Sequence, residues 1–315
     1  MAATSNFQSL LLMLKRAGSL RSLGNVSLMT KFSVLLPVYY RDSPEYFAQC
    51  LNSLAVQTRP AEEILIVKDG PLGRALEDVI ETYSAKLPVT TLQLPENRGL
   101  GPALKAGVEK CRFDVIARMD ADDICTKERF ELEVGFLEAH PEVDVLSGTI
   151  REFNSDPEAW ISERRLPREH ASIVVFAKRR NPLNHMAVVF RKSAVLAAGN
   201  YPSRPGFEDY ALWVQMLLNG SKLHNLETVC MFARCGNGMH QRRGGWSYAW
   251  NEASLFWHFR SLGFLSTLDA LRSISQRLPL RLVPVPFRSL LYRIFARSRG
   301  YGRAFQQRRN SQNSG

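Results

Sequence analysis

Three aspartates fall within four residues of one another, at positions 120, 122 and 123. They directly follow residues 115–119, which are predicted to form a buried strand. Carboxylates this close repel one another unless a cation or hydrogen-bond donors neutralise them, and such oxygen ligands suit Mg²⁺ or Mn²⁺ that bridges substrate phosphates. The alternative is that Asp122 or Asp123 only caps the next turn. Their place at a strand end favours a metal-diphosphate site.

Two other positions could contact a nucleotide. Asp69 precedes Gly70 and Pro71, so its carboxylate could either bond the backbone of a turn or accept the N–H and O–H donors of a base or ribose. Arg98 lies in the segment Asn-Arg-Gly-Leu-Gly, next to a predicted helix start that suits an anion. Neither motif is specific by itself.

Glu208 and Asp209 begin a predicted helix that continues to Leu218. Acidic side chains at a helix N-terminus interact favourably with the helix dipole by about 0.3–1 kcal/mol each, which is one reason for their presence. A carboxylate there could equally accept the proton of an attacking hydroxyl group. The pair is therefore a candidate for base catalysis.

Histidines and arginines of the second half are weaker candidates. His185 ends the segment Asn-Pro-Leu-Asn-His, which begins at Asn181, and is predicted to be a hydrogen-bonded structural residue. His240 precedes Arg242 and Arg243, which are followed by two glycines. This cationic loop could clamp a diphosphate or be a solvated turn.

The elements that must position these residues alternate between strand and helix from residue 32 to about 150. Strands are predicted at 32–36, 63–67, 89–94, 114–119 and 143–147, and helices at about 43–57, 72–86, 101–111 and 126–140. Such alternation implies a parallel sheet covered on both faces, with ligands bound at the carboxyl ends of its strands. The polar residues that fall at those ends are Tyr39, Asp69, Asn97, Arg98 and the aspartates 120–123. Beyond residue 150 the alternation is lost, and from Trp246 the chain is predicted to be mostly helical.

Composition predicts one large α/β domain with appendages. The chain has 315 residues, of which 45% are hydrophobic and 23% charged, and its net charge is +11. Residues 1–31 carry four basic residues and no acid, and residues 265–315 carry ten arginines and one aspartate. The remainder holds 27 basic and 29 acidic residues. Because the basic excess lies outside the central part, a globular nucleic-acid reader is disfavoured.

The C-terminal arginines alternate with large apolar residues, which suits a helix lying on an anionic lipid surface. The alternative is that its apolar face packs on the core. The last residues, from 303 on, are predicted to be disordered. No run of about 18 apolar residues predicts a spanning helix, and the five scattered cysteines are predicted to be reduced cytosolic thiols.

In their order along the chain, these motifs resemble those of glycosyltransferase family 2, whose catalytic domain has the GT-A fold. The resemblance covers roughly residues 32–250 and rests on an ordered set of segments: 32–39, 67–72, 97–101, 119–123, 208–213 and 242–245. The arginine-rich helical tail is also similar to that of bacterial exopolysaccharide and lipopolysaccharide members.

The resemblance implies an α/β GT-A fold with a mostly parallel central sheet, helices on both faces and a helical, basic C-terminal extension. The predicted parts are a basic appendage (1–31), the GT-A domain (32–250), a helical basic extension (251–302) and a disordered tail (303–315). Within the GT-A domain, a nucleotide-sugar half (about 32–150) would precede an acceptor half (about 151–250).

The resemblance also implies roles on the donor side. Tyr39 and Asp69 would contact the uracil and ribose of a UDP-sugar, and Pro37 would shape the first loop. Asp120 would meet the ribose, and Asp122 would hold the Mn²⁺ or Mg²⁺ that bridges the diphosphate.

The implied roles on the acceptor side begin with Asp209 as general base and Glu208 as the less favoured candidate. His240 would lie beside the cation, or would close on the diphosphate together with Arg242 and Arg243. A base for the acceptor hydroxyl and a cation for the leaving diphosphate are what a single in-line, inverting displacement needs.

Departures from the family pattern refine these expectations. Tyr40 stands where many members have asparagine, and Lys68 replaces the first of a common aspartate pair, so base recognition is the part most affected. The Gln-x-x-Arg-Trp signature of processive synthases is not matched by Gln-Arg-Arg-Gly-Gly-Trp at 241–246. We therefore expect a non-processive enzyme, cytoplasmic and peripheral at the inner face of the membrane, with a lipid-linked or surface-polysaccharide acceptor.

Two alternatives stay open at this point. A sugar-phosphate nucleotidyltransferase would share the nucleotide-binding sheet, but it usually has a glycine-rich, basic loop after its first strand, unlike Pro-Val-Tyr-Tyr at 37–40. A non-enzymatic basic nucleic-acid-binding protein would bind with a steep salt dependence and would be indifferent to the loss of Asp122.

Overall fold

The computed structural model describes residues 29–235 and 245–282. The chain separates into two compact units, residues 1–30 and residues 31–315. All helices and strands within the described residues belong to the second unit. The N-terminal appendage before residue 29, the loop 236–244 and the basic tail from residue 283 on lie outside the described residues.

The first half of this unit alternates strands and helices as predicted. Its elements are β1 (Phe32–Val38), α2 (Pro44–Ala55), β2 (Glu63–Lys68), α3 (Arg74–Ser84), β3 (Val89–Gln93), α4 (Leu100–Lys110), β4 (Val115–Arg118), β5 (Ile124–Cys125), α5 (Arg129–Ala139) and β6 (Val145–Phe153). The predicted cap of the first helix is confirmed, because Ser43 Oγ accepts a hydrogen bond from the Tyr46 N–H at 3.3 Å and Pro44 opens the helix.

The second half is less regular and ends in two long helices. Its elements are β7 (Ser162–Arg164), α6 (His170–Ala177), β8 (Val189–Arg191), α7 (Lys192–Ala197), α8 (Glu208–Leu218), β9 (Leu223–Arg234), α10 (Trp246–Ser261) and α11 (Thr267–Leu282), with short 3₁₀ helices at Pro157–Ala159 and His185–Ala187. The predicted helix beginning at Glu208 is confirmed, and the predicted helical character after Trp246 is observed as far as Leu282, where the described residues end. None of the helices within the described residues is long and apolar enough to cross a bilayer.

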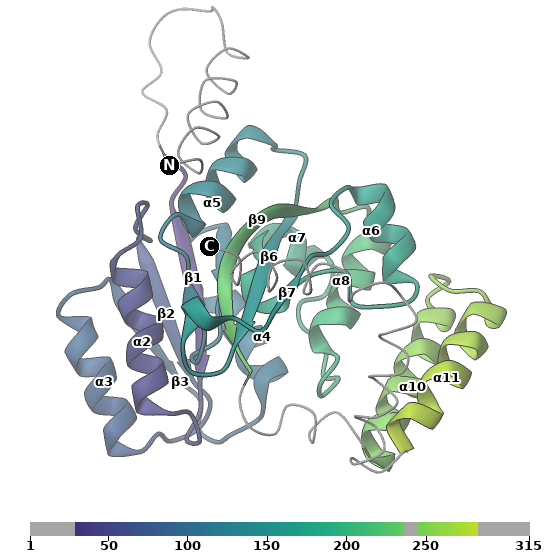
Figure 1. The fold of residues 1–315 in the computed structure, drawn as a ribbon, viewed down its shortest axis with the longest axis horizontal. Coiled ribbons are helices and arrows are strands. Elements are labelled where there is room, and N and C mark those ends of the chain that lie inside the picture. Colours follow the sequence, from purple (N-terminus) through teal and green to yellow (C-terminus); the bar gives the residue numbers. More distant parts are fainter. Residues whose placement is uncertain (1–28, 236–244, 283–315) are drawn as a thin grey trace, which may run out of the picture. The chain divides into compact units, whose positions relative to one another are not determined.

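The strands within the described residues form one sheet in the order β3-β2-β1-β4-β8-β6-β9-β5, with β7 paired to β6 (Figure 1). From β3 to β4 all pairs are parallel, as predicted. Beyond β4 the sheet is mixed, because β8 runs antiparallel to both β4 and β6, and β6 pairs in parallel with β9. This change coincides with the loss of βα alternation in the sequence, since crossover helices are what make neighbouring strands parallel.

Helices cover both faces of the sheet because successive side chains of its strands point to opposite sides. Val34 and Leu36 of β1 belong to a core that also contains buried residues of α2, α3 and α5. Leu35, between them, belongs to the opposite core with residues of α4, α7 and α8. All three β1 side chains are fully buried, and burial of such a side chain contributes about 1.5–3 kcal/mol.

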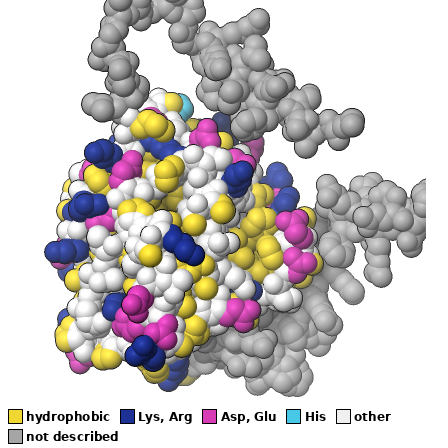
Figure 2. Space-filling view, turned by 90° about the vertical axis from the view of Figure 1, so that its left-hand side faces the viewer, with side chains coloured by type: hydrophobic (Ala, Val, Ile, Leu, Met, Phe, Trp, Pro, Cys, Tyr) yellow, Lys and Arg dark blue, Asp and Glu magenta, His cyan; other side chains and the backbone are white. Residues whose placement is uncertain are grey.

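The outer face of α2 and α3, which lie side by side on the first core, carries charges of both signs. Figure 2 shows dark-blue and magenta side chains interspersed there, with scattered apolar ones. This face therefore presents no large basic surface of the kind a nucleic-acid reader needs.

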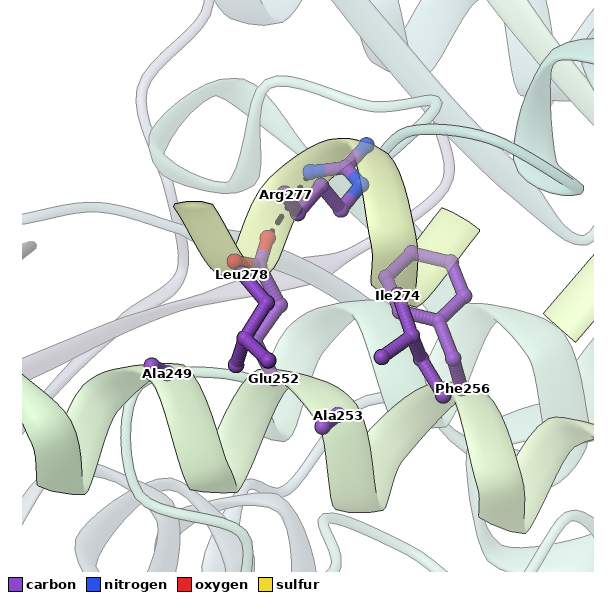
Figure 3. A pocket seen from close by; sticks show the side chains of 7 residues that line it. All are labelled: Ala249, Glu252, Ala253, Phe256, Ile274, Arg277 and Leu278. Carbon is purple, nitrogen blue, oxygen red and sulfur yellow. Dashed lines mark hydrogen bonds and ion pairs between the residues drawn. The ribbon is translucent and has the colours of Figure 1, made fainter. Parts of the chain in front are cut away.

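The helix α10 joins the rest of the unit through α8. Tyr210 and Val214 of α8 form a third apolar cluster with Leu255, Phe256 and Phe259 of α10. On its other side α10 packs against α11, where the buried Glu252 carboxylate accepts a hydrogen bond from Arg277 (Figure 3) and others from Arg281. The paired helices are thus attached to the helix that begins with Glu208 and Asp209.

Candidate active site

The predicted donor-side residues follow the carboxyl ends of β1 to β4, which are neighbours in the sheet. Pro37 is buried in β1, opposite Val67 of β2. The backbone carbonyl of Leu35 points toward β4, where it accepts a hydrogen bond from the Met119 N–H at 3.1 Å. The backbone nitrogen of Pro37 points to the same side of β1. Because β4 ends at Arg118, an N–H at this position would have no strand partner, so proline breaks no hydrogen bond of the sheet.

Asp69 holds the loop that precedes α4. Its side chain is buried, and its carboxylate accepts hydrogen bonds from the backbone N–H of Arg98 (2.8 Å), the N–H of Gly99 (2.9 Å) and the amide of Asn97 (3.0 Å). Gly70 is required beside it, because φ is +84° and a Cβ would lie 2.6 Å from the Asn97 nitrogen. Asp69 therefore bonds a neighbouring loop rather than its own turn. A carboxylate has about four acceptor positions, of which these three hydrogen bonds occupy all but one.

Arg98 and Lys68 flank this loop in different ways. The Arg98 side chain is 61% exposed, and its Nε lies 4.0 Å from Glu96. The backbone of Arg98 is thus fixed by Asp69, while the guanidinium is free to reach a ligand. Lys68 precedes Asp69, and its Nζ donates to the Glu77 carboxylate at 2.7 Å. Residue 68 therefore takes part in a salt bridge with Glu77 and offers no free carboxylate.

The loop after β1 contains an acid that the sequence did not single out, Asp42. Its Oδ2 accepts a hydrogen bond from the Tyr39 N–H at 2.9 Å. Burial, together with the charges of Asp122 and Asp120, raises the pKa of Asp42 to about 7. Asp42 therefore faces the same space as the aspartates that follow β4.

Asp42 makes the stability of the metal-free protein depend on pH. Its pKa is raised from 3.8 to about 7 in the folded state, so the folded chain binds more protons than the unfolded chain between these values and stability falls as pH rises through this window. We expect the free energy of unfolding to decrease by about 1–3 kcal/mol between about pH 5 and pH 8. Urea unfolding at several pH values measures this.

The matched control is Asp42→Asn, whose amide oxygen still accepts the Tyr39 N–H. This variant should show a clearly flatter pH dependence. An unchanged slope would mean that other groups carry it.

The three aspartates after β4 have three different environments. Asp120 is 30% exposed and forms a bidentate salt bridge with the Arg118 guanidinium. Asp123 is buried, and its Oδ1 accepts the backbone N–H of Arg234 at 2.8 Å. Asp122 is exposed. The Asp123 carboxylate therefore bonds the distant strand β9 and not the next turn, and Asp122 is the carboxylate left open to a ligand.

Electrostatics at Asp122 fit a cation. Although the residue is exposed, partial desolvation together with the charge of Asp120 raises the pKa of Asp122 to about 6. Asp123 adds an orphan carboxylate oxygen, Oδ2, which has no hydrogen-bond partner. A divalent cation would relieve this repulsion.

No group of three or more potential metal ligands occurs among the side chains that the structure describes. A cation here would accordingly be bound by Asp122 and by oxygens of the substrate diphosphate, which is a common arrangement for Mg²⁺ and Mn²⁺. His240, Arg242 and Arg243 lie outside the described residues.

Arg118 is the main residue of the site that sequence reasoning missed. It is 1% exposed at the end of β4, where it pairs with Asp120. Burial raises the pKa of four carboxyl groups, and the charge of Arg118 counteracts the rise at each of them: Asp122, Asp123, Glu208 and Asp209. Arg118 therefore lies between the aspartates after β4 and the acids that begin α8. The sequence feature that could have revealed this residue is an arginine within an otherwise apolar predicted strand.

Asp209 is held at the N-terminus of α8 by two donors. Its Oδ1 accepts the N–H of Tyr210 at 2.7 Å, and its Oδ2 accepts the side-chain amide of Asn181. The side chain is 15% exposed. Burial raises the pKa of Asp209, and these two hydrogen bonds oppose the rise. The result is an accessible carboxylate with increased affinity for a proton.

Glu208 is more enclosed than its neighbour. It is 7% exposed, and a Cβ on Gly101 would lie 3.4 Å from the Glu208 Cβ, so Glu208 packs against the first turn of α4. Burial and the charge of Asp209 raise the pKa of Glu208, and its Oε2 has no hydrogen-bond partner. Asp209 is thus the better placed of the two to meet a substrate.

His185 is a structural residue, as predicted. Its Nε2 lies 3.0 Å from the Tyr201 hydroxyl, and its ring packs edge-on against Trp213. Burial and the charge of Arg118 hold the pKa of His185 well below its usual range. The imidazole is therefore neutral, and its contact with Asp209 at 3.8 Å is no ion pair.

The sequence profile of glycosyl transferase family 2 matches residues 33–195. A relative from Erwinia amylovora, described as the amylovoran biosynthesis glycosyltransferase AmsE, is 40% identical over 83% of this chain and 97% of its own length. An Escherichia coli relative, described as UDP-Gal:alpha-D-GlcNAc-diphosphoundecaprenol beta-1,3-galactosyltransferase, is 34% identical over 84% of this chain and 95% of its own.

Among solved structures, the mannosyltransferase PcManGT from Pyrobaculum calidifontis, in complex with GDP-Man and Mn²⁺, superposes with a TM-score of 0.58. The match covers 93% of this chain and 88% of that one at 16% identity, and it shows the shared GT-A fold. The match of the family profile over half of the chain and the two relatives above show that this protein is a glycosyltransferase that belongs to family 2.

Proposed function

We propose that the protein transfers one sugar from a UDP-sugar to a lipid-linked saccharide acceptor, with inversion at the anomeric carbon and with the help of a divalent cation. The observation that carries the proposal is the pair of acidic groups on either side of Arg118, one suited to a cation and one to a proton. The E. coli relative supports the substrate classes, because its printed name includes a UDP-sugar and a polyprenol-diphosphate sugar.

On the donor side, the loops after β1 to β3 bind the nucleotide. Tyr39, Asp69 and Asp120 contact the base and ribose, and Pro37 keeps the first loop in place. Asp69 has one free acceptor position for this task, and Arg118 orients the Asp120 carboxylate through their salt bridge. The exposed Arg98 guanidinium reaches the phosphates.

Asp122 would hold the Mn²⁺ or Mg²⁺, which when bound would supply positive charge to stabilise the leaving diphosphate. Asp122 is the open carboxylate of its loop, and its raised pKa reflects a repulsion that a cation removes. For His240, Arg242 and Arg243, the proposed ligand is the same diphosphate.

Asp209 accepts the proton of the acceptor hydroxyl as its oxygen attacks the anomeric carbon and the bond to the diphosphate breaks. Burial brings the pKa of Asp209 closer to neutral pH, which strengthens a general base. Asn181 fixes one carboxylate oxygen and orients the group. Glu208 is the second candidate for the base.

The first test is calorimetric titration of the protein with UDP in the presence of Mn²⁺ and then of EDTA. Micromolar binding that EDTA abolishes is expected for a nucleotide-diphosphate site completed by a cation. Binding that is equal in EDTA would contradict the assignment of Asp122. UDP-sugars are then screened for transfer to a diphospholipid-linked N-acetylglucosamine.

The enzyme is further proposed to act without processivity and at the inner face of the cytoplasmic membrane. Seven arginines and no acid occur between residue 283 and the C-terminus, and each basic residue near an anionic lipid surface contributes about 1 kcal/mol. Deletion of residues 284–315 is expected to lower binding to anionic vesicles by about tenfold or more. Vesicle flotation measures this.

The matched control is deletion of residues 303–315 alone, which leaves the arginines at 288, 293, 297 and 299. This shorter deletion should retain most of the binding. If the parent and the longer deletion bind anionic vesicles equally, the tail does not mediate membrane binding.

A further inference from the structure

Three tryptophans form a stripe along the solvent side of α10. Trp246, Trp250 and Trp257 are 68%, 67% and 48% exposed. At 3.6 residues per turn, their positions lie within about 40° of one another around the helix axis. We call these three side chains the tryptophan stripe.

The stripe is exposed although α10 is firmly packed. The opposite face of the helix buries Leu255, Phe256 and Phe259 against α8. Glu252 forms salt bridges with two arginines of α11, of which Figure 3 shows Arg277. The helix therefore cannot turn to bury its tryptophans without breaking this packing. The other two tryptophans differ: Trp213 is fully buried, and Trp160 is 36% exposed.

We propose that the tryptophan stripe is an interfacial membrane anchor, which inserts between the headgroups of an anionic bilayer. Tryptophan favours this region because its ring is apolar and its N–H can still reach water. Charge complementarity identifies the occupant, because the Arg260 guanidinium lies over the Trp257 ring at 4.9 Å and the chain beyond α11 adds seven arginines without an acid.

Apolar insertion and cationic attraction are two separate signals, and stable binding of a peripheral protein to a membrane usually takes two. The stripe supplies the part that does not depend on salt. The arginines supply the part that salt screens.

The anchor is one helix away from the proposed catalytic base. Tyr210, which follows Asp209, stacks edge-on against Phe256 and Phe259 of α10 at centroid distances of 6.3 and 5.0 Å. Contact of α10 with the bilayer thus holds α8 and its acids near the surface in which a lipid-linked acceptor is embedded. This part of the inference rests on the proposed function.

The test compares the parent protein with the triple variant Trp246→Ser, Trp250→Ser, Trp257→Ser in flotation with phosphatidylcholine vesicles that contain or lack phosphatidylglycerol. The triple variant should bind the anionic vesicles at least about tenfold more weakly, and high salt should remove what remains. The parent's tryptophan emission should shift to shorter wavelength on binding. Trp160→Ser is the matched control and should bind as the parent does.

Two outcomes would contradict the anchor. Unchanged vesicle binding by the triple variant would overturn it, and a loss of self-association in place of vesicle binding would assign the stripe to a second copy of the chain. UDP binding is measured in parallel. Lost vesicle binding with normal UDP affinity supports the anchor alone, whereas absent UDP binding in the parent would contradict the proposed function and leave the vesicle result standing.

Discussion

Replacement of Asp209 with asparagine is expected to lower the rate of sugar transfer by about 10²–10⁴-fold, which is the usual contribution of a general base. The amide cannot accept the proton of the acceptor hydroxyl. Its oxygen can still accept the Tyr210 N–H, so the start of α8 should keep its geometry. UDP affinity, measured by calorimetry, should stay within about twofold, since the base acts on the acceptor and not on the nucleotide.

Glu208→Gln is the matched control for this experiment. Glu208 is enclosed against Gly101 and has a carboxylate oxygen without a partner, so its loss should affect transfer much less than the loss of Asp209. If Asp209→Asn keeps a tenth or more of the parental rate and Glu208→Gln does not, the base is Glu208. In the parent, transfer should decline on acidification at a pH above 3.8, because burial raises the pKa of Asp209 above that ordinary value.

Asp122→Asn is expected to lower the affinity for UDP in the presence of Mn²⁺ by at least about 100-fold. Partners of metal ligands in the outer shell are themselves worth about 10–100-fold in metal affinity, so the loss of a direct ligand should cost more. Without Mn²⁺, the variant and the parent should bind UDP equally weakly. Thermal stability of the metal-free variant should be unchanged or higher, because the substitution removes repulsion from Asp120.

Asp123→Asn separates metal binding from loop structure. Asp123 bonds the backbone of Arg234, and an asparagine oxygen can accept the same N–H. This variant should therefore keep Mn²⁺-dependent UDP binding within about tenfold of the parent. If Asp122→Asn retains full Mn²⁺-dependent affinity, the cation is held elsewhere.

Local sequence determined much of the fold. The apolar run of β1 is buried along its whole length, and Ser43 and Pro44 start α2 where they were predicted to. These features depend on interactions between residues close in the chain, so periodicity and capping reveal them. The alternation of strands and helices likewise predicted that Asp69 and Asp120 lie at strand ends. Parallel strands bring these carboxyl ends to one edge of the sheet.

Tertiary structure alone decided how the acids differ. Nothing in the run of aspartates tells which is buried; packing against Arg234 encloses Asp123 and leaves Asp122 open. Arg118 could be placed between two groups of carboxylates only after α8 and β4 had come together, although 90 residues separate Arg118 from Glu208. Asp42 likewise acquires its raised pKa from residues far along the chain.

The exposure of the tryptophans of α10 could not be predicted from the sequence either. Their spacing alone is equally compatible with a buried face, and it is the packing of Phe256 and Phe259 against α8 that turns them to solvent. Pattern and propensity report short-range interactions, which determined the elements and their ends. Burial, charge pairing and exposure depend on contacts between distant segments, and these were decided only when the chain folded.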